Sequence, residues 1–94
     1  MIKSFKNGES EDLFNDVLVG RFKAFERSAR RKLLYLHRAR VLRDLAVPPG
    51  NRLEALKKDR EGQHSTRIND RWRICFRWED GNALEVEIVD YHKG

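Results

Sequence analysis

The stretch RINDRWRICFRW, residues 67–78, decides the fold of this chain. Its large apolar residues recur at every second position: Trp72, Ile74, Phe76 and Trp78. Because alternate residues of a β-strand point to opposite faces of the sheet, this spacing predicts a strand over 72–78 with one core-facing side. The other side carries arginines in a row, Arg71, Arg73 and Arg77, with Cys75 among them. What this arginine face binds is the functional question.

Size and composition favour one globular domain over residues 1–94. Hydrophobic residues make up 39% of the chain, which is too many for a disordered protein. The opening residues lack the apolar stretch of a signal peptide, no run is long enough to span a membrane, and the single cysteine cannot form an internal disulfide. We therefore expect a cytoplasmic protein that does not enter membranes.

Positive charge is concentrated in the middle of the chain. Residues 21–60 hold thirteen basic side chains against four acidic ones, within a net charge of +5 for the whole chain. Such a cluster attracts polyanions by long-range steering and by counterion release. A solvated helix face is the alternative, and charge alone does not separate RNA, DNA and an acidic protein as partners.

The pattern along the chain predicts an α+β fold. Residues 1–5 are predicted to form a short strand. Ser10 is predicted to cap a helix that ends at Gly20, and residues 21–45 are predicted to form a longer helical segment with a break near 37–39. Pro48 and Pro49 end that segment. Apolar and polar residues alternate only weakly over 52–57, so this segment can be either a strand or a turn. Strands over 63–68, 72–78 and 83–91 follow, so we expect an N-terminal strand and helices on one face of a mainly antiparallel sheet.

The register of the last two strands follows from their apolar residues. Placing all of them on the core face sets Phe76 opposite Val86 and Ile74 opposite Ile88, which requires a connecting loop of odd length. On the outer face, Arg77 then lies opposite Glu85, where the two form a structural pair. Cys75 then lies opposite Glu87. Arg73 faces Val89 with Tyr91 diagonal to it, and it lacks a direct acidic partner.

Common catalytic and ligand motifs are missing from the sequence. It has no glycine-rich phosphate loop, no zinc-type cysteine pair and no H-E-x-x-H, and His37, His64 and His92 lie far apart. We expect no cofactor and no bound metal. Cys75 is read as a small packing residue rather than as a nucleophile.

The remaining polar residues suit RNA cleavage without a metal. That reaction needs a base for the ribose 2′-OH, cations for the charge that grows on phosphorus, and an acid for the leaving 5′-oxygen. The candidate cations lie on or beside adjacent strands: Lys57, Lys58, Arg60, Arg67 and Arg73. The chain closes with further candidates, Asp90, Tyr91 and His92. Physical chemistry permits this function without requiring it.

A resemblance adds to this reading. IKSF (2–5), PPGNRLEALKKDREGQHSTRINDRWRICFRW (48–78) and VEIVDYH (86–92) resemble HigB toxins of the RelE/ParE-like toxin–antitoxin superfamily. The resemblance implies a microbial-RNase-like fold and an endoribonuclease that cuts messenger RNA in the decoding site of the ribosome. It also implies a toxin that is monomeric alone and forms a heteromeric complex with a helix-turn-helix antitoxin of the HigA type. Its other partners would be 16S ribosomal RNA and messenger RNA.

The resemblance also assigns residues. Lys57, Arg67 and Arg73 match cations around the scissile phosphate, and Asp90 and Tyr91 match C-terminal active-site positions, followed by His92. Glu54 stands where some HigB relatives have a histidine; a carboxylate can act as the base but donates a proton only if its pKa is raised. We assign RNA-binding roles to Arg52, Lys58, Arg60 and His64. His64 is a candidate acid, although strict alternation with Ile68 turns it toward the core.

Two other functions remain open at this level. A ParE-like protein would inhibit DNA gyrase by binding to it. A basic RNA-binding module without catalysis is the other alternative, for which Glu54 is the main argument.

Overall fold

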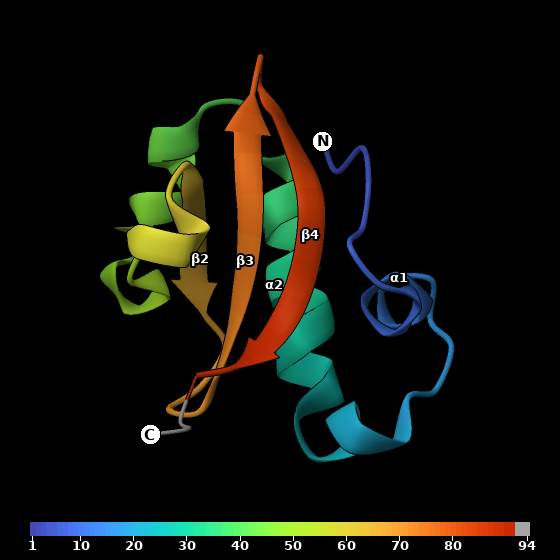
Figure 1. Cartoon of the computed structure of the whole chain (residues 1–94). Coiled ribbons are helices and arrows are strands. Elements are labelled where there is room, and N and C mark those ends of the chain that lie inside the picture. The colour runs from blue at the N-terminus through green and yellow to red at the C-terminus, as the bar shows by residue number, and fades with distance from the viewer. Residues whose placement is uncertain (92–94) are drawn as a thin grey trace.

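The computed structural model, which describes residues 1–91, is an α+β fold and confirms the predicted class. Its antiparallel sheet has the order β1-β2-β3-β4, with β1 at Glu54–Ala55, β2 at Gln63–Arg67, β3 at Trp72–Glu79 and β4 at Asn82–Asp90. Helix α2 (Glu26–Arg38) lies behind the sheet, and α1 (Gly8–Phe14) lies beside β4 (Figure 1). Short 3-10 turns complete the chain: η1 at Gly20–Phe25, η2 at Leu42–Ala46, η3 at Pro49–Asn51 and η4 at Lys58–Arg60. Within residues 1–91, no helix has the length and apolar character to cross a membrane.

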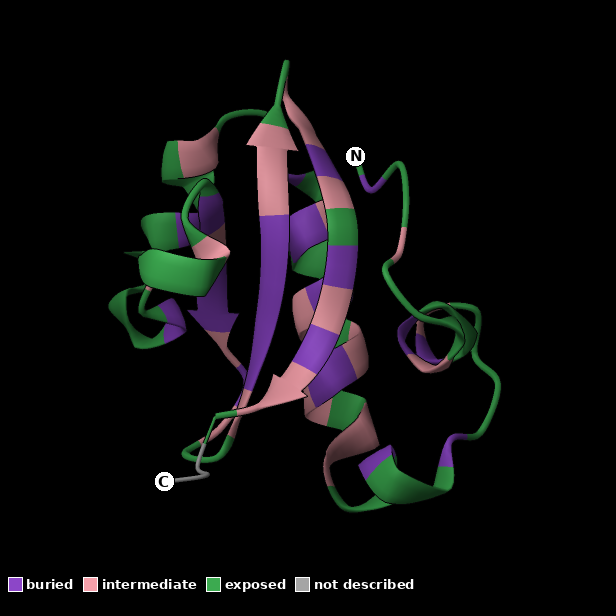
Figure 2. Cartoon of the chain, in the orientation of Figure 1, coloured by how far each residue is buried: buried purple, intermediate pink, exposed green. Residues whose placement is uncertain are grey.

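The core lies between α2 and the sheet, as the apolar spacing predicts. The 3.6-residue spacing over 21–45 predicts an apolar stripe of Phe22, Phe25, Ala29, Leu33 and Leu36; all of these are buried except Phe25, which is partly buried against the core. The sheet contribution is Ile74, Phe76, Val86 and Ile88, also buried. Figure 2 shows the buried middle of β3 between the more exposed ends of the strand. Trp72 is only partly buried and stacks on Phe25, with ring centroids 4.9 Å apart.

The predicted boundaries of the first helix are wrong. Asn7, not Ser10, is the N-cap, and its side chain accepts a hydrogen bond from the Ser10 amide at 2.9 Å. Ser10 lies inside α1, is fully buried, and accepts a hydrogen bond from the Ile88 amide at 3.0 Å. The helix ends at Phe14, so Val17 and Leu18 are exposed instead of continuing its apolar side.

The longer helical segment breaks where we expect it. Helix α2 ends at Arg38, and Ala39 has extended backbone angles. The chain then continues as the separate turns η2 and η3, so residues 21–45 are one α-helix flanked by 3-10 turns rather than a bent helix.

Residues 1–5 do not form the predicted strand. They touch the edge of β4 through two isolated parallel bridges, Ile2 with Ala83 and Phe5 with Val86. Between these bridges, the amide of Glu85 donates to the hydroxyl of Ser4 at 2.9 Å. A side-chain oxygen therefore takes the place of a backbone acceptor and interrupts the ladder.

The β3–β4 register is confirmed at one end and wrong at the other. Arg73 lies opposite Val89, Ile74 opposite Ile88 and Cys75 opposite Glu87, as predicted. The loop, however, is the two-residue Asp80-Gly81 turn with positive φ at both positions, not an odd-length loop.

With a two-residue turn, a regular ladder would turn Val86 away from the core, and a β-bulge in β4 prevents this. β4 gains one residue opposite β3 between Cys75 and Arg77, and Glu85 takes a φ of 53° there. The bulge keeps Val86 in the core but turns Ala83, rather than Leu84, inward. Arg77 consequently lies opposite Leu84, although its Nε still reaches Glu85 at 3.0 Å.

The outer face of the sheet is partly covered as well. Figure 1 shows η4 in front of β2, on the opposite side from α2. Arg60 of this turn bonds to Glu87 of β4 at 3.0 Å and to Gln63 at 3.1 Å. Cys75 beneath it is fully buried, and burial raises the pKa of its thiol to about 11. The structure therefore agrees with a packing role for Cys75.

Candidate active site

A polar cleft of about 310 Å³ opens where β3 begins and β4 ends. Its lining comes from β1, β2, β3 and the adjoining loops: Arg52, Glu54, Arg67, Asn69, Asp70, Arg73 and Tyr91. The cleft thus gathers four of the predicted catalytic positions: Glu54, Arg67, Arg73 and Tyr91.

Two cations lie opposite each other in this cleft. Arg67 of β2 and Arg73 of β3 are cross-strand partners and therefore share a face. Like charges placed directly opposite destabilise a sheet unless they are compensated. Each arginine has a carboxylate beside it: Arg67 pairs with Asp70, and Arg73 lies 3.7 Å from Glu54.

Arg73 is far more enclosed than the outer-face position predicts. It is 8% exposed, its Nε donates to the hydroxyl of Ser65 at 2.8 Å, and its Nη2 donates to the carbonyl of Arg52 at 2.6 Å. Its guanidinium lies 5.6 Å from the centroid of the Tyr91 ring, so the predicted neighbour is confirmed. The predicted lack of an acidic partner is wrong, because β1 brings Glu54 to it.

The orientation of Arg73 depends on residues that sequence reasoning missed. Ser65 is fully buried and holds Nε, while the carbonyl of Arg52 is available because that residue has a left-handed conformation, with φ of 48°. Asn69 shapes the next turn by accepting hydrogen bonds from the amides of Arg71 and Trp72, both at 2.8 Å. The N-D pair between two strands is a recognisable turn signal, whereas nothing local marks Ser65.

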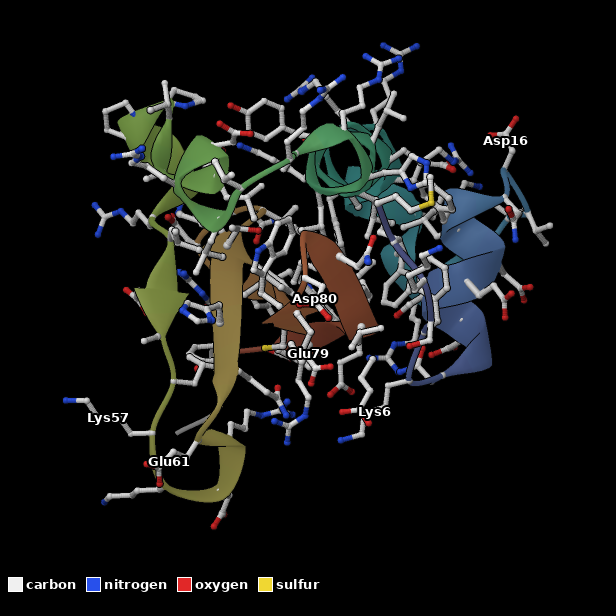
Figure 3. The ribbon with its side chains drawn as sticks, turned by 90° about the horizontal axis from the view of Figure 1, so that it is seen from above. Lys6, Asp16, Lys57, Glu61, Glu79 and Asp80 are labelled. Carbon is white, nitrogen blue, oxygen red and sulfur yellow. The ribbon has the colours of Figure 1, made fainter. Side chains whose placement is uncertain are left out.

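A second hollow adjoins the first at Tyr91, which lines both. Its other lining residues are Lys57, Lys58, Asp59, Arg60 and Asp90. Lys57 is exposed, and Figure 3 shows its side chain pointing away from the sheet. The carboxylate of Asp90 bonds to Arg71 at 2.8 and 2.9 Å and thereby raises the pKa of that guanidinium. The two hollows form one continuous polar surface around Tyr91, and it contains every predicted site residue except His64 and His92.

His64 lies apart from this surface. Its ring packs on Phe76 with centroids 6.2 Å apart, and its Nδ1 is buried without a hydrogen-bond partner among residues 1–91. The expectation that it faces the core is confirmed, and the structure does not bring it to the predicted RNA-binding residues. His92 lies outside the described residues. Within residues 1–91, no three His, Cys, Asp or Glu side chains are grouped to hold a metal ion.

The chemistry available in the cleft is therefore electrostatic and acid–base. Arg67 and Arg73 can bind a phosphate, since a guanidinium offers paired donors to its oxygens. Glu54, half-exposed beside Arg73, can accept a proton. The exposed ring of Tyr91 can stack on a base.

Comparisons with known proteins agree on one family. The family model described as "RelE-like toxin of type II toxin-antitoxin system HigB" matches residues 3–92. Toxin HigB-1 of Vibrio cholerae serotype O1 is 37% identical over 95 residues, covering 99% of each chain. Endoribonuclease HigB of Proteus vulgaris is 42% identical over 41 residues, covering 44% of this chain and 45% of that protein.

Solved structures support the same fold. The YoeB–YefM complex from Staphylococcus aureus contains a chain that matches with a TM-score of 0.57 at 18% identity, covering 99% of both chains. A heterotetrameric YoeB–YefM toxin–antitoxin complex from the same organism matches with a TM-score of 0.58 at 18% identity.

Proposed function

Because the chain belongs to the HigB family of RelE-like toxins of type II toxin–antitoxin systems, we propose that it is an endoribonuclease that cleaves messenger RNA in the decoding site of the ribosome. The observation that carries this proposal is the Arg67–Arg73 pair with Glu54 beside it. Two guanidinium groups on one face, next to a carboxylate, supply charge stabilisation and a base for one phosphodiester.

In this mechanism, the RNA supplies its own nucleophile. Glu54 takes the proton from the ribose 2′-OH, the 2′-oxygen attacks phosphorus, and the P–O5′ bond breaks. Arg67 and Arg73 stabilise the negative charge on the phosphoryl oxygens, and Lys57, in the adjoining hollow, would contact the RNA beside the scissile phosphate. The products are a 2′,3′-cyclic phosphate and a 5′-hydroxyl, and the leaving oxygen takes a proton from Tyr91 or His92, while the Asp90 carboxylate is paired with Arg71. No metal takes part.

The ribosome supplies binding that the cleft alone lacks. The cleft is shallow and open, and its cations are partly compensated by Glu54 and Asp70. Lys58 and Arg60, which line the hollow beside the cleft, would bind 16S ribosomal RNA and orient the messenger. The protein would act in the cytoplasm, as a monomer, until a HigA-like helix-turn-helix antitoxin binds it.

Binding of RNA without cleavage is the second candidate. It is favoured by the cleft itself, where a carboxylate lies beside Arg73 and no imidazole lies among the described lining residues. Such a protein would stop translation and leave the messenger intact.

Mapping RNA ends after adding the purified protein to translating ribosomes separates these candidates. We expect new 5′-hydroxyl ends within codons in the decoding site and matching 2′,3′-cyclic phosphates upstream. Translation arrest with intact messenger would support binding alone. A 3′-hydroxyl product would contradict attack by the 2′-oxygen.

A further inference from the structure

A second concave surface lies on the exposed side of α2, next to the polar cleft: Lys32, which lines it, is close enough to Arg67 of the cleft for the two charges to interact. Two adjoining hollows that share Tyr35 and Arg38 run between α2 and the residues of η2 and η3. Figure 1 shows these turns, in green, on the β1–β2 side of α2. We call this surface the α2 groove. It shares no lining residue with the cleft of Arg67 and Arg73.

The floor of the α2 groove is apolar and exposed. Leu34 is 40% exposed and Val47 is 62% exposed, with Tyr35 and Pro48 between them. The hydroxyl of Tyr35 donates to the carbonyls of Asp44 and Val47, which fixes its ring in the floor. Exposed large apolar side chains gathered in one groove mark a surface that binds a partner.

The rim of the α2 groove is mainly basic. Arg31, Arg38 and Arg43 are exposed, and among residues 1–91 none of them has an ion pair. Asp44 is the one acidic lining residue, and its carboxylate accepts hydrogen bonds from the amides of Arg40 and Val41, which lower its pKa. The pKa of Lys32 is lowered mainly by burial, and further by the nearby positive charges of Arg31 and Arg67.

We infer that the α2 groove is the docking site for an acidic amphipathic segment of the protein antitoxin, whose apolar side chains fill the floor and whose carboxylates pair with Arg31, Arg38 and Arg43. This inference rests on the proposed antitoxin partner. The apolar floor of the groove favours a protein partner over RNA, because protein interfaces have apolar centres whereas nucleic acids are bound mainly through polar contacts to phosphate and sugar. The polar cleft has the second kind of composition. Antitoxin held in this groove does not need the catalytic arginines for its affinity.

The test is the affinity of groove variants for a purified HigA-like antitoxin that binds the wild-type protein. Arg38→Glu/Arg43→Glu should weaken binding by about 100-fold, because like charges then meet across the interface. Leu34→Asp should weaken it as well by placing a charge in the apolar floor. Arg27→Glu is the matched control for the single reversal Arg38→Glu, which changes the net charge by the same amount: Arg27 lies exposed on the same helix, outside the groove lining, and its variant should bind like the wild type.

Circular dichroism melting of each variant establishes that it is folded, and Leu34→Ser provides a milder floor variant if Leu34→Asp is not. Unchanged antitoxin affinity in both the rim and the floor variants would overturn the inference. A wild-type protein that does not bind the antitoxin would also overturn it. A third contrary result would be rim variants that no longer sediment with ribosomes but still bind the antitoxin, because the groove would then be an RNA-binding surface. The affinity is measured without RNA cleavage, so failure of the proposed nuclease activity leaves this result readable.

Discussion

Arg73 and Arg77 project from the same face of β3, four residues apart, yet their surroundings differ. Arg77, near the Asp80-Gly81 turn, has a 40% exposed side chain paired with Glu85. Arg73, at the open end of the hairpin, is 8% exposed and is held by Ser65, the Arg52 carbonyl and the ring of Tyr91. The difference shows that the role of an arginine on a strand depends on which elements cover it. β1 and its flanking loops cover only the open end.

The largest expected effect of a single substitution is that of Arg73→Ala. Cleavage should fall by roughly 10²–10³-fold, the range for loss of one electrostatic donor at a reacting centre. The melting temperature should fall too, because Ser65 and the Arg52 carbonyl lose a buried partner, at a cost of about 1–3 kcal/mol. Rate measurements on translating ribosomes and thermal melting check the two parts. An Arg73→Ala protein that cleaves at the wild-type rate would show that the guanidinium is only structural.

The stability part of that prediction comes from the structure and not from the sequence. Alternation alone places Arg73 on an outer face and predicts an unchanged melting temperature. The sequence predicts its neighbours Val89 and Tyr91, because the β3–β4 hairpin is local. It cannot predict the Arg52 carbonyl or Glu54 as partners, because these depend on where the two-residue strand β1 pairs. Ser65 lies on β2, and its hydrogen bond to Arg73 depends on the rotamer of a long side chain, which alternation does not specify.

The limits of periodicity also explain why the predicted loop length and register are wrong near the turn of the β3–β4 hairpin. Matching apolar faces requires an odd loop, whereas the Asp-Gly signal specifies a two-residue turn. The chain keeps the two-residue turn and still places Val86 in the core, because the bulge at Glu85 adds one residue to β4. Periodicity alone cannot locate such a bulge. The choice of Ser10 as a helix cap fails for a related reason, since its hydroxyl is committed to a distant partner, the Ile88 amide of β4.

A smaller effect, of opposite sign, is expected at the edge of the cleft. Asp70, whose side chain is 97% exposed, pairs with Arg67, and under the proposed function it would compete with RNA phosphate for that arginine. Asp70→Asn should therefore strengthen RNA binding up to about fivefold, since exposed pairs are worth no more than about 1 kcal/mol. Affinity for a non-cleavable messenger analogue on the ribosome measures this. Weaker binding by Asp70→Asn would show that Asp70 orients Arg67 rather than competing with the phosphate.

The smallest effect belongs to Arg77. Arg77→Ala removes a solvent-exposed pair with Glu85 and should lower stability by less than about 1 kcal/mol. Denaturant unfolding measures that change. A loss of several kcal/mol would mean that the bulge at Glu85 depends on this pair.

The most direct test of the account compares Arg67→Ala with Arg77→Ala in one cleavage assay on translating ribosomes. Each variant removes one partly exposed arginine that is paired with an exposed carboxylate, so the two match in net charge and in local stability. We predict that Arg67→Ala lowers the rate of new 5′-end formation by roughly 10²–10³-fold, while Arg77→Ala cleaves like the wild type. Equal losses in the two variants, or full activity in Arg67→Ala, would contradict the placement of the active site at the open end of the hairpin.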